Sequence, residues 1–354
     1  MSQLKFPGMV DAHVHLREPG ATHKEDVYSG TAAALAGGVI GILDMPNNTP
    51  PITRPDRLTA KQALFETKAV ADYGLFAGSD GSNIEDVLAM APGVVGLKLY
   101  LDETFGDLRN AEPEHLAALF ERWPGPGPIT VHAESASIVK ALELAERYSQ
   151  RLHVAHVPDP EDLLVIEAAR QRGIDVTCEV TPHHLLLSND AIGRLGALAI
   201  MKPPLVTPAQ RDLFWERLHL VDMIATDHAP HTLDEKRLAN PPPGVPGLET
   251  TVPLLLAAVD EDRLCYERFV ELVYHAPLRV YGLAAPADTE VLIDTAGGRY
   301  SLPRLGFHTR CGWSPFEGLP ALGRVHAVRL RGRTVWADGC LLAEPGSGRP
   351  LARV

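Results

Sequence analysis

The stretch Met9-Val10-Asp11-Ala12-His13-Val14-His15-Leu16 decides the fold class of this chain. It is a short run of apolar residues that ends in alternating polar side chains, a pattern typical of a buried β-strand. Alternation along a strand points His13 and His15 to the same face. Two neutral imidazoles on one face can bind one metal ion, although the pair alone leaves a structural or surface role open.

Seven further strand-like runs follow this stretch, with helix-length segments between them. The strand-like runs span residues 39–45, 70–77, 94–101, 128–133, 152–157, 175–180 and 223–226. Apolar periodicity predicts helices over residues 28–36, 55–66, 113–122, 136–148 and 160–172. Strands that alternate with helices indicate parallel strands joined by crossover helices. We therefore expect an α/β protein whose eight strands form a (β/α)8 TIM barrel.

The character of the sequence changes after about residue 285. Short strand-like pieces at residues 291–294, 324–330 and 334–338 are separated by turns rich in Gly, Pro and Asp. These pieces predict a small β-rich appendage. The first barrel strand starts near residue 9, so the few residues before it are expected to join the appendage. We expect a barrel over residues 8–285 and a composite domain of residues 1–7 plus 286–354.

Composition limits the classes of partner. The 354 residues are 45% hydrophobic and 22% charged, with a formal net charge of −12. This acidic balance argues against general binding to nucleic acid or to an anionic membrane surface. The four cysteines are scattered without CxxC spacing. This pattern is typical of reduced thiols in a protein of a reducing compartment. With no signal-peptide pattern and no apolar run long enough to span a bilayer, we expect a cytoplasmic protein with no membrane partner.

Polar residues gather where the predicted strands end, which is where barrel enzymes carry their catalytic groups. His13 and His15 end the first strand, and Lys98 lies late in the fourth. The fifth and sixth strands end in histidines, and an aspartate directly follows the eighth. This pattern predicts a metal site made of His13, His15, Lys98, His132, His156 and Asp227. The histidines elsewhere, His115, His153, His219 and His326, are expected on the surface.

Lys98 is the unusual member of this set. Burial of a lone ammonium group is costly, so a salt-bridged core lysine and a ligand for a substrate carboxylate are both open interpretations. A free ammonium group cannot bind a metal ion. If the amine takes up carbon dioxide, the resulting carbamate is an anion whose two oxygens can bridge two cations.

Several motifs together resemble the dihydroorotases of the amidohydrolase superfamily. They are DAHVHLREPG (11–20), MPN (45–47), GLKLYL (96–101), TDHAPH (226–231), PGLET (246–250) and WSPF (313–316). The resemblance covers nearly the whole chain and is especially close to the dihydroorotase domain of the animal multienzyme pyrimidine protein. It implies the reversible, zinc-dependent cyclisation of N-carbamoyl-L-aspartate to L-dihydroorotate in pyrimidine biosynthesis.

The resemblance also implies roles for individual residues. Two zinc ions per subunit are expected, bridged by carboxylated Lys98 (N6-carboxylysine), with Asp227 as the catalytic acid and base. The expected substrate contacts are Arg17, Asn47, His231, Thr104 and Phe105, of which the last two match a mobile lid. The loop after the seventh strand reads KPPLV where bacterial relatives often carry NPPLR, and Lys202 is the cation expected to contact substrate there.

Other functions share parts of this pattern. Allantoinase and dihydropyrimidinase/hydantoinase have the same metal cage, but their substrates lack the ring carboxylate that Arg17 and Asn47 would recognise. An inactive homologue that serves as a scaffold for aspartate transcarbamoylase typically loses metal ligands, and all six positions are kept here. A non-catalytic metal-binding protein would not need a lid. We expect a small-molecule substrate, a homodimer, and an association with aspartate transcarbamoylase as a further option.

Overall fold

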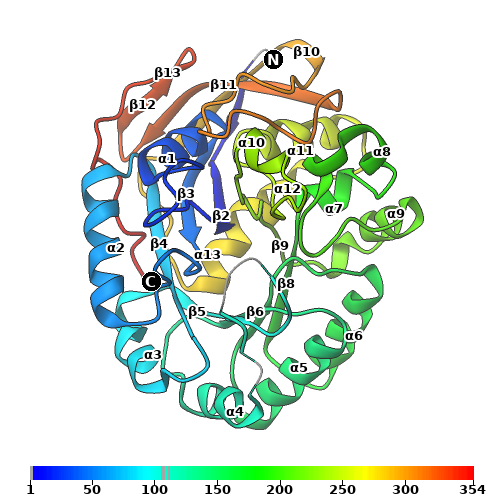
Figure 1. The fold of residues 1–354 in the computed structure, drawn as a ribbon. Helices are drawn as coiled ribbons and strands as arrows, with labels where there is room; N and C mark the ends of the chain where they lie inside the picture. The colour runs from blue at the N-terminus through cyan, green and yellow to red at the C-terminus, as the bar shows by residue number, and fades with distance from the viewer. Residues whose placement is uncertain (1–2, 105–107, 111) are drawn as a thin grey trace.

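The fold consists of an eight-stranded parallel barrel and a separate five-stranded antiparallel sheet (Figure 1). A computed structural model describes residues 3–104, 108–110 and 112–354. The barrel strands are β2 (Met9–Val14), β3 (Val39–Asp44), β4 (Asp72–Gly78), β5 (Gly96–Tyr100), β6 (Ile129–His132), β7 (Leu152–Val154), β8 (Val176–Val180) and β9 (Met223–Ile224). Their order in the sheet follows their order in the chain, as in a TIM barrel.

Burial on both faces explains why these strands read as nearly continuous apolar runs. Every residue of β2, β3, β4 and β5 is buried. Helices α2 to α6 cover the outside of the barrel, as Figure 1 shows. The helices of the chain are α1 (Val27–Ala36), α2 (Pro55–Lys68), α3 (Ile84–Met90), α4 (Pro113–Arg122), α5 (Ala136–Tyr148), α6 (Pro160–Gln171), α7 (Pro182–Leu186), α8 (Ala191–Leu195), α9 (Pro208–Glu216), α10 (Leu233–Lys236), α11 (Thr251–Asp260), α12 (Tyr266–Val270) and α13 (Ala276–Tyr281).

The barrel closes between its first and last strands through residues just beyond β9. His228 forms a parallel bridge with Val14, and its carbonyl oxygen accepts a hydrogen bond of 2.8 Å from the backbone N–H of His15. Below this point, Asp11 accepts hydrogen bonds from the backbone N–H and the hydroxyl of Thr226. The closing contacts therefore lie next to the predicted metal ligands.

The second sheet joins the two ends of the chain. Strand β1 (Gln3–Phe6) pairs with β10 (Glu290–Ser301), and β11 (Pro320–Leu330), β12 (Arg333–Ala337) and β13 (Cys340–Leu341) follow in order, all antiparallel. In Figure 1 this sheet runs along the top of the view, near α1 and α11. The C-terminal segment then returns to the barrel and pairs with Tyr73 of β4.

The predicted fold class is confirmed, since all eight predicted strands overlap an observed one and the appendage is a sheet that includes the extreme N-terminus. The division into domains at residues 8 and 285 stays a prediction. Among the described residues, none of the helices has both the length and the apolar character that crossing a bilayer requires.

Candidate active site

A cavity opens at the carboxyl ends of the barrel strands. It has an empty volume of about 380 Å³, part of which is open to solvent. Nine of the predicted site residues line it: His13, His15, Arg17, Asn47, Thr104, His132, His156, Lys202 and Asp227. Lys98 is fully buried on β5, and its amine lies 5.4 Å from the ring centre of Tyr100, which also lines the cavity.

Three side chains of the site stand at positions where the backbone turns sharply as its strand ends. Arg17, His156 and Asp227 have φ angles of 63°, 34° and 46°, in the left-handed region that residues other than glycine rarely adopt. Such conformations are held in place by surrounding structure and gather at functional sites. Here they aim strand-end side chains into the cavity.

His13, His15 and Asp227 form one half of the predicted metal cage, which we call the β2–β9 half. One oxygen of Asp227 lies 3.5 Å from Nε2 of His13 and 3.1 Å from Nε2 of His15. Burial lowers the pKa of His15 to about 4, so this imidazole is neutral at pH 7. Burial alone would raise the pKa of Asp227, but the three nearby histidines outweigh it and hold that pKa well below its usual range.

The outer nitrogens of the two histidines in the β2–β9 half are held by other side chains. Nδ1 of His13 lies 2.5 Å from Glu179, and Nδ1 of His15 lies 2.6 Å from the amide oxygen of Asn47. With the proton of each ring on Nδ1, toward these oxygens, each Nε2 would present its lone pair beside Asp227 to a metal ion. Glu179 also accepts a hydrogen bond of 3.0 Å from Nε2 of His153.

Lys98, His132 and His156 form the other half of the cage, which we call the β5–β7 half. Nδ1 of His132 and Nε2 of His156 lie 2.9 Å apart. Three atoms here are buried with no hydrogen-bond partner among the described residues: Nζ of Lys98, Nε2 of His132 and Nδ1 of His156. Burial, with the nearby Lys98 adding to it, lowers the pKa of His132 to about 3. Burial also lowers the pKa of Lys98 to about 8.

These residues fit a metal centre. Nitrogen and carboxylate atoms of His13, His156 and Asp227 lie within 4.8 Å of one another. Neutral imidazoles with a carboxylate are the donor set that zinc prefers. The unpartnered amine of Lys98 is a costly feature unless something binds it, and a pKa near 8 leaves part of the amine neutral and able to take up carbon dioxide.

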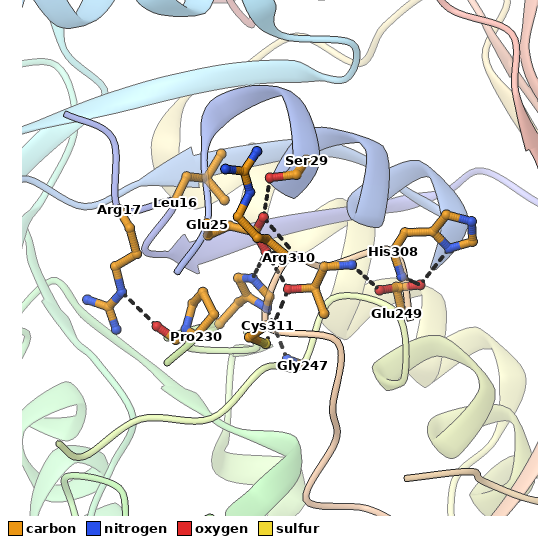
Figure 2. Close-up of polar contacts among 12 residues, drawn as sticks. Leu16, Arg17, Glu25, Ser29, Pro230, Gly247, Glu249, His308, Arg310 and Cys311 are labelled. Carbon is orange, nitrogen blue, oxygen red and sulfur yellow. Dashed lines mark hydrogen bonds and ion pairs between the residues drawn. The ribbon is translucent and has the colours of Figure 1, made fainter. Parts of the chain in front are cut away.

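A positive group borders the cage on its β2 side. The guanidinium Nε of Arg17 donates to the carbonyl of Pro230 at 3.2 Å, and Figure 2 shows this side chain beside that loop. Burial lowers the pKa of Arg17 to about 10, which still leaves it charged at neutral pH. His231 is buried behind Arg17, 3.2 Å away, and is not part of the cavity wall. Lys24 lies 3.1 Å from the other ring nitrogen of His231, so two cations flank this imidazole.

The remaining predicted contacts lie at the cavity rim. Thr104 lines the cavity, and the amine of Lys202 donates to the carbonyl of Glu103 at 3.2 Å. Phe105, the other predicted lid residue, lies outside the described residues.

The structure adds two residues to the predicted set of site residues and corrects one expectation. Tyr100 lines the cavity, and its position two residues after Lys98 on the same strand was a usable signal. Glu179 holds His13 from the next-to-last strand. His153, expected on the surface, is completely buried between Glu179 and Thr177, so that expectation was wrong.

A parallel barrel with four histidines, an aspartate and a buried lysine at its carboxyl end defines a metal-dependent hydrolase of the amidohydrolase type. Comparison with known proteins narrows this class. Residues 2–103 match the family model described as dihydro-orotase-like. The dihydroorotase of Halobacterium salinarum is 36% identical over 94% of this chain and 86% of its own length. The chain belongs to the dihydroorotase family.

The chain is also similar to a longer multifunctional protein in sequence and to a hydantoinase in structure. The multifunctional protein CAD of Squalus acanthias is 41% identical over 98% of this chain, and the chain spans only 16% of that protein's length. Among solved structures, the L-hydantoinase (dihydropyrimidinase) of Arthrobacter aurescens is 25% identical, with a TM-score of 0.94 over 99% of this chain and 89% of that one.

Proposed function

We propose that the protein is a dihydroorotase that interconverts N-carbamoyl-L-aspartate and L-dihydroorotate in pyrimidine biosynthesis. The observation that carries this proposal is the position of Arg17 on the same cavity wall as His15 and Asp227. A charged guanidinium beside a predicted metal cage suits a cyclic amide that bears a carboxylate.

We propose that the cage holds two zinc ions. His13, His15 and Asp227 would hold one, His132 and His156 the other, and Lys98, carboxylated at Nζ, would contact both. Zinc bound by these residues would supply polarisation of the ring amide carbonyl and would lower the pKa of a bound water molecule toward ~7.

The side chains of this chain would supply proton transfer and orientation. Asp227 would take a proton from the attacking water and deliver it to the ring nitrogen that leaves as the C–N bond breaks. Arg17 and Asn47 would hold the ring carboxylate, with His231 supporting Arg17 from behind. Lys202 and Thr104, at the rim, would contact the substrate as the cavity closes, and loss of water would strengthen these contacts.

Hydrolysis of hydantoins, dihydropyrimidines or allantoin is the second candidate function, favoured by the fold shared with a hydantoinase. Those rings carry no carboxylate, so they would leave Arg17 without an anionic partner from the substrate. Arg17 therefore distinguishes the two candidates.

The test is an assay of the zinc-loaded protein and of Arg17→Met with L-dihydroorotate, hydantoin, dihydrouracil and allantoin. We expect the wild type to act on L-dihydroorotate, and Arg17→Met to lose about 10- to 100-fold in kcat/KM because a charge-assisted pair is lost. The exposed Arg333 offers a matched control, Arg333→Met, which should behave as wild type. Hydrolysis of hydantoin or allantoin without action on dihydroorotate would overturn the proposal.

A homodimer and an association with aspartate transcarbamoylase also stay proposals. The support is indirect, because CAD, by its name, is a multifunctional protein. Light scattering of the purified chain tests the first proposal, and co-sedimentation with aspartate transcarbamoylase tests the second. A monomer that sediments alone would contradict both.

A further inference from the structure

A second cluster of polar contacts lies beside the cavity, where the antiparallel sheet sends a loop back to the barrel. This loop, residues 302–319, connects β10 to β11. Figure 2 shows two carboxylates of the barrel, Glu25 and Glu249, beside this loop, where they contact residues 308–310. Neither carboxylate lines the active-site cavity.

Glu249 binds the loop alone. It accepts hydrogen bonds from the backbone N–H groups of His308 and Thr309, at 2.9 and 2.8 Å, and from the His308 ring at 3.0 Å. Within the part of the chain that the structure describes, its hydrogen bonds and ion pairs are all with these two loop residues. Glu249 is therefore an anchor for the loop.

Glu25 binds the loop in the same way but also faces the active site. It is completely buried and accepts hydrogen bonds from the hydroxyls of Ser29 and Thr309. The backbone N–H of Arg310 lies 3.2 Å from both of its oxygens. On its other side, Oε2 lies 3.5 Å from Nε2 of His228.

His228 is the residue through which Glu25 can reach the chemistry. Its Nδ1 accepts a hydrogen bond of 3.1 Å from the backbone N–H of Gly247, so the proton of the neutral ring sits on Nε2, the atom that faces Glu25. That Nε2 is buried and forms no hydrogen bond among the described residues, so its 3.5 Å contact with Glu25 is an electrostatic one. The backbone of His228 follows Asp227 directly, and its carbonyl accepts from the N–H of His15.

We propose that Glu25 is a positioning residue of the active site. Through His228 it fixes the seam where the barrel closes, and so fixes Asp227 and His15 relative to each other. Because Thr309 and Arg310 supply two of the donors that hold Glu25, the loop from the antiparallel sheet becomes part of the catalytic scaffold. This inference rests on the proposed dihydroorotase function.

A carboxylate is required at position 25 because Ser29, Thr309 and Arg310 all donate hydrogen bonds to it. Nε2 of His228 faces it at 3.5 Å as a further polar contact. An amide at this position would direct an N–H group at another donor, either His228 or the backbone of Arg310. The seam would then shift, and small displacements of catalytic groups are expensive. A misplacement of about 1 Å can cost about a hundredfold in rate.

The test compares Glu25→Gln with the matched control Glu249→Gln, both zinc-loaded and assayed with L-dihydroorotate. Both variants lose an anchor of the same loop, so both should lower the melting temperature. We expect Glu25→Gln to lower kcat about tenfold with KM within about twofold of wild type, a partial loss of positioning. Glu249→Gln should keep the wild-type kcat. An equal fall of kcat in the two variants, or none in Glu25→Gln, would overturn the proposal.

Two further measurements keep the proposal testable on their own. If Glu25→Gln does not fold, Thr309→Val removes one donor to Glu25 and should lower kcat two- to threefold, whereas an unchanged kcat would refute the role. Imidazole ¹⁵N spectra need no substrate, and the Nε2–H signal of His228 should shift in whichever of these two variants folds. If the wild type does not convert dihydroorotate, the proposed function fails, while this shift still decides whether Glu25 acts on His228.

Discussion

The two halves of the predicted metal cage differ in how their ligands are held. In the β2–β9 half, the outer nitrogens of His13 and His15 are hydrogen-bonded to Glu179 and Asn47. In the β5–β7 half, the outer nitrogens of both histidines and the amine of Lys98 have no hydrogen-bond partner within the described ranges. One half is oriented by protein side chains, whereas the other has its two histidines facing each other.

This difference predicts that the two halves would bind a metal ion with different affinities. Outer partners fix the tautomer and direction of a histidine before a metal arrives, and their removal typically costs 10–100-fold in affinity. The described residues give the β5–β7 half no such partners, so an anionic Lys98 would have to hold its two histidines together through the metal ions. We therefore expect the β2–β9 half to bind zinc more tightly and the β5–β7 half to depend on carboxylation.

The largest test of this contrast is Lys98→Ala. Loss of the bridging group should abolish turnover, a fall of at least about a thousandfold, because both metal-assisted and acid–base contributions fail together. The β2–β9 half should survive, so metal analysis should fall from two zinc ions per chain to one. Lys5→Ala, at an exposed position on β1, is the control. Two retained ions with full activity would refute the bridging role.

Glu179→Gln tests the support of the β2–β9 half directly. One oxygen of Glu179 contacts His13 Nδ1 and accepts from the backbone N–H of His156, and the other contacts His153 Nε2, so the single oxygen of an amide can serve only one of these two sides. We expect zinc affinity of the tighter site to fall about 10- to 100-fold, measured by competition with a chromogenic chelator. The weaker site should change little. If both sites weaken equally, the two halves are not independently supported.

The sequence could predict the inner side of the cage but not its outer support. Strand ends are readable from apolar runs, and the carboxyl ends of parallel strands meet at one rim, so the six ligands of the proposed cage could be predicted without coordinates. Glu179 reaches His13 from a strand 166 positions away, a contact set by barrel closure and strand tilt. His153 was misplaced because both faces of a barrel strand are buried, so alternation does not indicate exposure.

Asn47→Asp separates metal support from substrate recognition in the β2–β9 half. An aspartate keeps an oxygen acceptor for His15 Nδ1, so zinc affinity should stay within about twofold of wild type. The added negative charge should repel a substrate carboxylate and raise KM about tenfold, which corresponds to ~1.4 kcal/mol. Steady-state kinetics and chelator competition on one preparation measure both. A loss of zinc with KM unchanged would assign Asn47 to the metal alone.

Thr177→Val asks how far the support of His13 extends, and it should have the smallest effect. The hydroxyl of Thr177 lies 2.8 Å from Nδ1 of His153, whose other nitrogen lies on Glu179. A valine has nearly the same volume but leaves that buried nitrogen without its partner. Because three contacts separate Thr177 from the metal ligand His13, zinc affinity of the tighter site should fall only about two- to threefold, below the effect of a direct outer partner. A loss as large as that of Glu179→Gln would mean that the series of contacts from Thr177 to His13 acts as one unit. The support of the β2–β9 half would then include Thr177 and His153 as well as Glu179.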